Sequence, residues 1–274
     1  MKQMKISVFY QHIEEAARQS GLPISDVLAK VKSFGISGVE LDYHSLGDKN
    51  QLKSALDKAE LETSSIYCHF DFGHFYDKEK AESLIDTAVF FGAKKVLCIA
   101  GFIEKNDNRQ ECLDRMTENL NLLCGLAEKK DIVVTMEDFD GETAPYATAE
   151  GLKYFCDRVP LLGITFDTGN FLYSEIDELS ALDVLEDRVV HVHCKDRTFE
   201  VKAGEEPKAT VDGRMMYSSP VGSGIIRVDE VVRRLIQRGY DDYLAIEHFG
   251  SQNQLDDINK SAAWLKSLLF NLLY

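Results

Sequence analysis

Four side chains that could hold a metal ion follow short apolar runs in the second half of the chain. They are Glu137 in VVTMEDF, Asp167 in GITFDTGN, His193 in VVHVHCKD and Glu247 in YLAIEHFG. Three carboxylates brought to one place would repel one another, and a bound divalent cation would remove that repulsion. Oxygen ligands with one nitrogen suit Mn²⁺, Mg²⁺ or Co²⁺, and Zn²⁺ also accepts Asp, Glu and His. If the fold brings these residues together, they predict a site for one divalent metal ion.

The segment VVHVHCKDR, residues 189–197, places two histidines at the end of an apolar run. Successive side chains of a strand point to opposite faces, so His191 and His193 share one face while Val192 and Cys194 share the other. Such a pair could be two hydrogen-bonded core histidines as well as part of a site. Each candidate carboxylate could equally be a helix cap or half of a salt bridge. The choice depends on whether the strand ends meet.

Eight short β-rich runs alternate with longer amphipathic stretches along the whole chain. The runs are KISVFY, GVELDY, TSSIYCHF, KVLCIAG, VVTMEDF, GITFDTG, VVHVHC and YLAIEHF. This alternation indicates parallel β/α units, and eight units in 274 residues favour one closed (β/α)8 barrel over an open sheet. The glycine-rich nucleotide loop of many open sheets, GxGxxG, is absent from the sequence. We therefore expect one α/β barrel domain over residues 1–274, with its chemistry at the carboxyl ends of the strands.

The composition argues against several classes of protein. A formal net charge of −15 disfavours nucleic acid as a partner. No segment approaches the ~20 continuous apolar residues that cross a membrane, and the N-terminal apolar run is too short for a signal peptide, so we expect a cytoplasmic protein. The six cysteines form no CxxC pair and are expected to be reduced thiols. The apolar C-terminal segment, residues 256–274, should close the ring or contact a second subunit, which leaves a homo-oligomer open.

Several motifs, in their order along the chain, resemble those of the xylose isomerase-like barrel superfamily, which includes sugar phosphate isomerases and epimerases. The motifs are GVELDYHS, MEDF, FDTGN, HVHCKDR, PVGSG and GYDDYLAIEHFG, and the resemblance covers essentially the whole chain. It implies that one divalent ion (Mn, Mg, Co or Zn) is held by Glu137, Asp167, His193 and Glu247. His191 would then support His193 from one layer deeper in the barrel.

The resemblance also implies a chemistry. In the isomerases and epimerases of this group, the carbonyl and a neighbouring hydroxyl of a sugar chelate the metal, which stabilises an enediolate. Glu137 and Glu247 would be the catalytic acid and base on the two faces of the substrate. We therefore expect a sugar or sugar phosphate isomerase or epimerase. A dehydratase of a cyclic polyol or keto acid, similar to inosose dehydratase, would use the same metal and a similar proton abstraction, and the sequence leaves this alternative open.

Two further functions are less well supported. An apurinic-site endonuclease of this fold would need more histidines, and Asn170 and Arg214 stand where those enzymes carry histidine. A barrel that binds a sugar without catalysing a reaction is disfavoured, because all four expected metal ligands are present.

Four residues near the expected site are candidates for contact with a small sugar or polyol substrate. Lys195 and Arg197 could bind hydroxyls or a phosphate, although a surface salt bridge with Asp196 would also explain them. His69 ends the third predicted strand and could point at the substrate. Asn170 could orient a ligand, or it could simply form a turn after the sixth strand.

Overall fold

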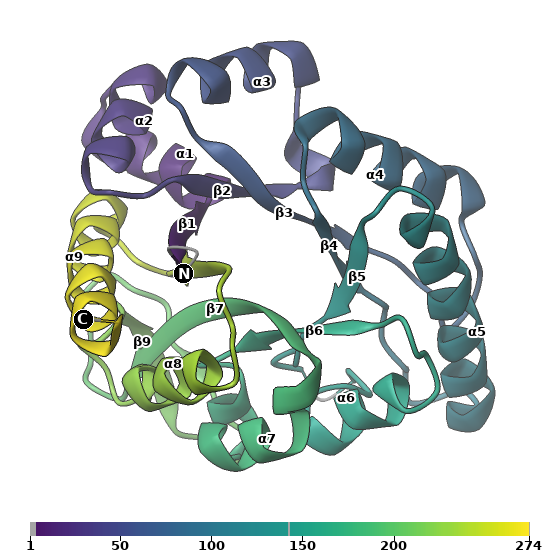
Figure 1. Cartoon of the computed structure of the whole chain (residues 1–274). Coiled ribbons are helices and arrows are strands. Elements are labelled where there is room, and N and C mark those ends of the chain that lie inside the picture. Colours follow the sequence, from purple (N-terminus) through teal and green to yellow (C-terminus); the bar gives the residue numbers. More distant parts are fainter. Residues whose placement is uncertain (1–3, 142, 274) are drawn as a thin grey trace.

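The computed structural model describes residues 4–141 and 143–273, which form a closed barrel of parallel strands surrounded by helices (Figure 1). The barrel strands are β1 (Lys5–Phe9), β2 (Gly38–Asp42), β3 (Glu62–His69), β4 (Lys95–Ile99), β5 (Val133–Met136), β6 (Gly163–Asp167), β7 (Val189–Thr198) and β10 (Tyr243–Glu247). Each strand pairs in parallel with the next, and β10 closes the ring by pairing with both β7 and β1. The predicted (β/α)8 barrel is confirmed.

Helices connect the strands and cover the outside of the barrel (Figure 1). They are α1 (Tyr10–Ser20), α2 (Ile24–Ser33), α3 (Lys49–Lys58), α4 (Lys78–Phe91), α5 (Arg109–Glu128), α6 (Ala149–Cys156), α7 (Glu178–Leu185), α8 (Val228–Gln237) and α9 (Gln254–Leu273), with short 3-10 turns η1 (Tyr43–Ser45), η2 (Phe171–Ser174) and η3 (Glu186–Arg188). The side chains of Asp48, Asp77 and Asn108 accept backbone N–H groups and so cap α3, α4 and α5. The last helix, α9, packs against α1 and α2 and closes the ring, as expected.

The inner face of the barrel carries polar side chains, whereas the layer between strands and helices is apolar. In β2, Val39 and Leu41 belong to the main hydrophobic core, while Glu40 between them points the other way and is fully buried. Thr135 of β5 and Thr165 of β6 are likewise buried, with their hydroxyls 2.7 Å apart. A strand buried on both faces can keep polar groups inside only if they pair with one another. The barrel interior therefore supplies the groups from which a site can be built.

One part of the fold was not predicted. The end of β7 pairs antiparallel with β9 (Met215–Ser219), which in turn pairs with β8 (Lys208–Ala209). Both added strands are short, and β8 is exposed, so they lack the apolar run that marks a barrel strand.

The cysteines of the described chain are buried free thiols within the main hydrophobic core, as expected. None of the helices within residues 4–141 and 143–273 has the length and apolar character needed to cross a membrane.

Candidate metal centre

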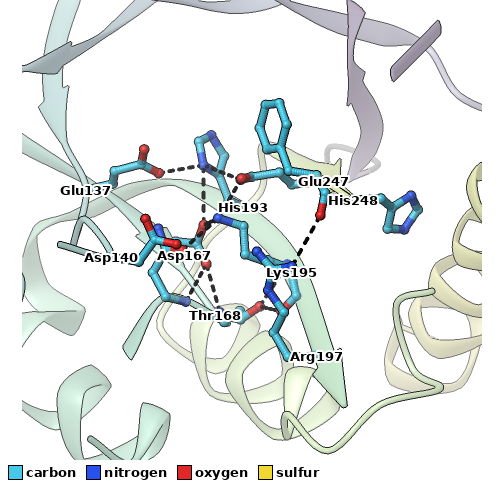
Figure 2. Close-up of polar contacts among 12 residues, drawn as sticks. Glu137, Asp140, Asp167, Thr168, His193, Lys195, Arg197, Glu247 and His248 are labelled. Carbon is cyan, nitrogen blue, oxygen red and sulfur yellow. Dashed lines mark hydrogen bonds and ion pairs between the residues drawn. The ribbon is translucent and has the colours of Figure 1, made fainter. Parts of the chain in front are cut away.

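Four strand ends at one side of the barrel bring Glu137, Asp167, His193 and Glu247 together (Figure 2). Glu137 directly follows β5, Asp167 and Glu247 end β6 and β10, and His193 lies within β7. Parallel pairing sets Asp167 beside His193, and His193 beside Ala245, so the side chains emerge at similar heights. One possible ligand atom from each of the four residues lies within 4.8 Å of the others. The strand ends therefore meet, as the sequence analysis expected.

These four side chains are almost completely shielded from water. Asp167 and His193 are 0% exposed, Glu247 is 4% exposed and Glu137 is 8% exposed. Burial raises the pKa of the Glu137 carboxyl to about 7, although the adjacent His193 opposes that shift. Burial also raises the pKa of Asp167 against the opposing effect of Lys195. The site therefore concentrates carboxyl groups where negative charge is costly.

The imidazole of His193 faces the carboxylates through its Nδ1 atom. This nitrogen lies 2.8 Å from Oε2 of Glu137, 3.2 Å from Oε2 of Glu247 and 4.0 Å from Oδ2 of Asp167. The opposite nitrogen, Nε2, lies 2.9 Å from Oε2 of Glu40. Histidines that ligate a metal through one nitrogen usually offer the other N–H to a carboxylate, which fixes the ring and its tautomer. The ring is therefore oriented for Nδ1 to act as the ligand.

Glu40 is the supporting residue that the sequence analysis missed. Its Oε2 also lies 3.2 Å from Nε2 of His191, so one carboxylate joins the two histidines of β7. Burial alone would raise the pKa of Glu40, but His193 and His191 outweigh it and hold that pKa well below its usual range. His191 thus supports His193 through Glu40. The available signal was a glutamate between the apolar residues Val39 and Leu41 of a strand.

The local backbone fixes one oxygen of Asp167. Its Oδ1 accepts the N–H groups of Gly169 at 2.8 Å and of Asn170 at 2.9 Å, which leaves Oδ2 directed toward His193. The side chain of Asn170 donates to the carbonyl oxygen of Asp138 at 2.9 Å. Asn170 therefore positions Asp167 and the loop after β6, and direct contact with a substrate remains a prediction.

Lys195 lies inside the centre. Its Nζ is 2.8 Å from Oδ2 of Asp167, 2.5 Å from Oε1 of Glu247 and 2.7 Å from Oδ1 of Asn170 (Figure 2). Burial alone would lower the pKa of Lys195, but Asp167 and Glu247 outweigh it and raise that pKa. The same contact keeps the pKa of Glu247 well below its usual range, despite the opposing effect of burial. Lys195 is therefore a protonated, buried cation beside two expected metal ligands, and its ion pairs among the described residues are with these two rather than with Asp196, the alternative partner.

The donor atoms fit a divalent cation. Oδ2 of Asp167 and Oε2 of Glu247 are buried and accept no well-aligned hydrogen bond from the described residues, although Lys195 and His193 lie within ion-pair distance of them. Buried carboxylate oxygens without such bonds are costly unless a cation is bound. Together with Nδ1 of His193 they form an oxygen-rich set with one nitrogen, which suits Mn²⁺, Mg²⁺, Co²⁺ or Zn²⁺.

The other two predicted substrate contacts lie outside this cluster. His69 ends β3, where its ring centre is 6.4 Å from that of Phe139, and burial lowers its pKa. Arg197 is buried, and its Nη1 donates to the carbonyl oxygen of Phe249 at 3.3 Å. Within the described chain, its Nε has no hydrogen-bond partner. Neither residue contacts the four expected ligands among the interactions of the described residues, so their contact with a substrate stays a prediction.

Asp196 holds a loop beside the end of β7. Its carboxylate accepts the N–H groups of Gly222 at 2.9 Å and Gly224 at 2.8 Å in the PVGSG segment, and of Ile226 at 3.1 Å just after it. A Cβ atom at Gly224 would lie 2.2 Å from Oδ1 of Asp196, so this close approach requires glycine. Asp196, which stands between Lys195 and Arg197, is therefore a structural residue.

Apolar side chains face the metal centre from the opposite part of the barrel. Phe9, Tyr67, Leu97 and Ile99 form a buried cluster separate from the main core. The ring of Phe9 lies edge-on to His193, with 5.0 Å between the ring centres. The ligand cluster thus borders an apolar surface that can exclude water.

Known proteins resemble the chain in both sequence and fold. A family model described as xylose isomerase-like TIM barrel matches residues 28–268. The inosose dehydratase of Serratia proteamaculans (strain 568) is 30% identical over 243 residues, which cover 78% of this chain and 78% of that protein. The IOLI protein with a bound zinc atom superposes with a TM-score of 0.75 at 15% identity, over 98% of this chain and 99% of that one. An L-ribulose 3-epimerase also superposes with a TM-score of 0.75 at 15% identity, over 98% of this chain and 96% of that one.

Because the family model spans most of the sequence and the barrel closes as that family requires, this chain belongs to the xylose isomerase-like TIM barrel family.

Proposed function

We propose that this chain is a metal-dependent dehydratase that acts on a cyclic polyol ketone of the inosose type. The observation that carries the proposal is the buried ammonium of Lys195, which lies between Asp167 and Glu247 inside the candidate metal centre. It provides a proton donor beside the place where a chelated substrate would bind. The similarity to inosose dehydratases supports this function over the isomerase or epimerase that the sequence analysis favoured.

The proposal assigns the metal to Glu137, Asp167, His193 and Glu247, with Glu40 holding the histidine. When bound, the ion would polarise the substrate carbonyl and make the neighbouring C–H group more acidic. The zinc in the IOLI structure and the magnesium in a Mycobacterium smegmatis protein of similar fold agree with a divalent ion. The structure does not favour one of these metals over Mn²⁺ or Co²⁺, because the donor set suits all of them.

Two groups of this chain would carry out the proton transfers. Glu137, whose pKa lies at about 7, is suited to accept a proton near neutral pH from the carbon next to the carbonyl. With Asp167 and Glu247 engaged as metal ligands, the pKa of Lys195 would fall from its raised value, and Lys195 would donate a proton to the departing hydroxyl on the next carbon. One C–H bond and one C–O bond break, a carbon–carbon double bond forms, and water leaves. Glu247 would hold Lys195 in place through its contact of 2.5 Å.

An epimerase is the second candidate, and one observation favours it. Glu137 and Glu247 reach the centre from β5 and β10, so they approach His193 from separate sides (Figure 2). Two carboxylates so placed could remove a proton from one face of a sugar and return it to the other.

A single assay separates these two functions. The metal-loaded protein would be incubated in D₂O with an inosose and, in parallel, with a panel of ketoses, and the products would be weighed by mass spectrometry. The dehydratase should give a product lighter by one water from the inosose. A product that has lost no water but carries deuterium on the carbon next to the carbonyl would instead show an epimerase or isomerase. That result would overturn the dehydratase proposal.

A further inference from the structure

A second group of possible metal ligands lies outside the barrel centre, between two loops. Asp71 and His74 belong to the loop between β3 and α4. Asp107 belongs to the loop between β4 and α5, and Cys112 lies in the first turns of α5. These loops leave neighbouring strands at the end of the barrel that carries the metal centre, and the helices that follow them lie side by side (Figure 1). No step of the proposed dehydration uses any of these residues.

Three of these side chains converge on one point. A ring nitrogen of His74, a carboxylate oxygen of Asp107 and Sγ of Cys112 lie within 4.8 Å of one another. The Nε2 atom of His74 is 3.3 Å from Oδ2 of Asp107. Ligands at about 2.0 to 2.3 Å from a shared tetrahedral ion are separated by distances of this order.

The fourth residue orients the histidine. Oδ1 of Asp71 lies 2.6 Å from Nδ1 of His74, on the side of the ring away from Asp107. A carboxylate at Nδ1 keeps the proton there and leaves the lone pair of Nε2 for a metal, which is the usual arrangement around a ligating histidine. The backbone N–H of Glu104 donates to Oδ2 of Asp107 at 2.7 Å and fixes the second ligand.

The surroundings also suit a metal. Cys112 is buried, whereas the side chains of His74 and Asp107 are 39% and 22% exposed, so an ion can enter from solvent and reach the thiol. Gly73 packs over Cys112, and a Cβ atom there would lie 3.5 Å from Cβ of Cys112 and only 3.1 Å from Cε of Met116. The glycine therefore lets the loop approach the thiol closely.

We propose that His74, Asp107 and Cys112 form a second metal site, which takes Zn²⁺ with water as the fourth ligand and with Asp71 supporting His74. One nitrogen, one oxygen and one sulfur donor match the ligands that zinc accepts, and a thiolate distinguishes this site from the barrel centre. Binding would release the thiol proton of Cys112 to solvent. The bound ion would tie the loop after β3 to the loop after β4.

Cobalt is the probe for the test, because a thiolate bound to Co²⁺ gives a charge-transfer absorption in the near ultraviolet that nitrogen and oxygen ligands do not. The metal-free full chain, kept reduced with a non-thiol reductant, would be titrated with Co²⁺. We expect this absorption in the wild type, its disappearance when Zn²⁺ is added, and its persistence in Asp167→Asn, in which the barrel centre is weakened. That last variant separates this site from the proposed function.

Matched variants decide the assignment. Cys112→Ser should lose the absorption, whereas Cys124→Ser, the same change in another buried thiol of the same helix, should keep it. Asp71→Asn should weaken the cobalt affinity by about 10- to 100-fold, as expected for loss of a supporting carboxylate. Circular dichroism would verify that each variant is folded. Absence of the absorption from the folded wild type, or its persistence in Cys112→Ser, would overturn the proposal and leave His74 as an ion-pair partner of Asp71 and Asp107.

Discussion

The two halves of the barrel opening differ in chemistry. The polar half, at the ends of β5, β6, β7 and β10, carries Glu137, Asp167, His193, Lys195 and Glu247. The apolar half, from β1, β3 and β4, carries Phe9, Tyr67, Leu97 and Ile99. Electrostatic interactions are stronger where water is excluded. The apolar half should therefore strengthen the ion pairs and metal contacts of the polar half. We therefore expect the polar half to bind the metal and transfer protons and the apolar half to shield the site from water.

The largest effect should come from the polar half. Glu247→Gln removes the carboxylate that contacts Lys195 but keeps an amide oxygen of similar size, so we expect the protein to fold and turnover to fall roughly 10²- to 10⁴-fold. Steady-state kinetics on the substrate found by the mass assay would measure this. Glu150→Gln, on the exposed surface of α6, is the control and should be as active as the wild type. Full turnover by Glu247→Gln would remove Glu247 from the reaction.

The second-largest effect should come from Glu40, the carboxylate that supports His193. Glu40→Gln removes the charge that holds Nε2 of His193, and we expect the affinity for Mn²⁺ to fall about 10- to 100-fold. Isothermal titration calorimetry on the metal-free protein measures this directly. Glu178→Gln serves as control, because Glu178 is also a buried glutamate but binds Arg227 near α8. Equal losses in both variants would mean that Glu40 acts only through general stability.

Metal affinity in the polar half should depend on pH. Glu137 must lose its proton to become a ligand, and its pKa lies at about 7. His193 must also be unprotonated at Nδ1 to bind the metal. Its neighbours Glu40 and Glu137 outweigh burial and raise its pKa, so its protonation also lowers metal affinity as the pH falls. Mn²⁺ affinity should therefore fall at least about tenfold per unit as the pH drops below about 7. Titrations between about pH 8 and 6 that gave a constant affinity would contradict the raised pKa of Glu137.

The smallest effect on metal affinity should come from a change in the apolar half. Phe9→Leu shortens a buried side chain whose ring lies against His193, and we expect a loss of about 1 kcal/mol in the free energy of unfolding. Metal affinity should change less than about threefold, because no ligand atom is removed. Chemical denaturation and calorimetry measure the two quantities. A larger fall in metal affinity than in Glu40→Gln would erase the proposed division between the halves.

Much of this arrangement could be predicted from sequence. Glu137, Asp167, His193 and Glu247 each end or interrupt an apolar run, and a closed parallel barrel brings such positions to one side. Glu40 was missed because a strand pattern does not tell which distant strand its inner face will meet. The same limit applies to Lys195, whose path to Asp167 and Glu247 depends on how its long side chain folds back inside the barrel. The strands β8 and β9 were missed because strands of two and five residues depend on their pairing partner more than on their own residues.

The contact of Asp196 with the loop at residues 222–226 has a consequence for how this protein could be modified. Asp196 fixes the loop through backbone N–H groups, whereas Ser223 and Ile225 in the same loop are exposed. The loop shape is therefore largely independent of which side chains stand at those two positions. A library that randomises Ser223 and Ile225 should produce mostly folded variants, which makes them suitable attachment points for new recognition groups, whereas randomising Gly224 should not.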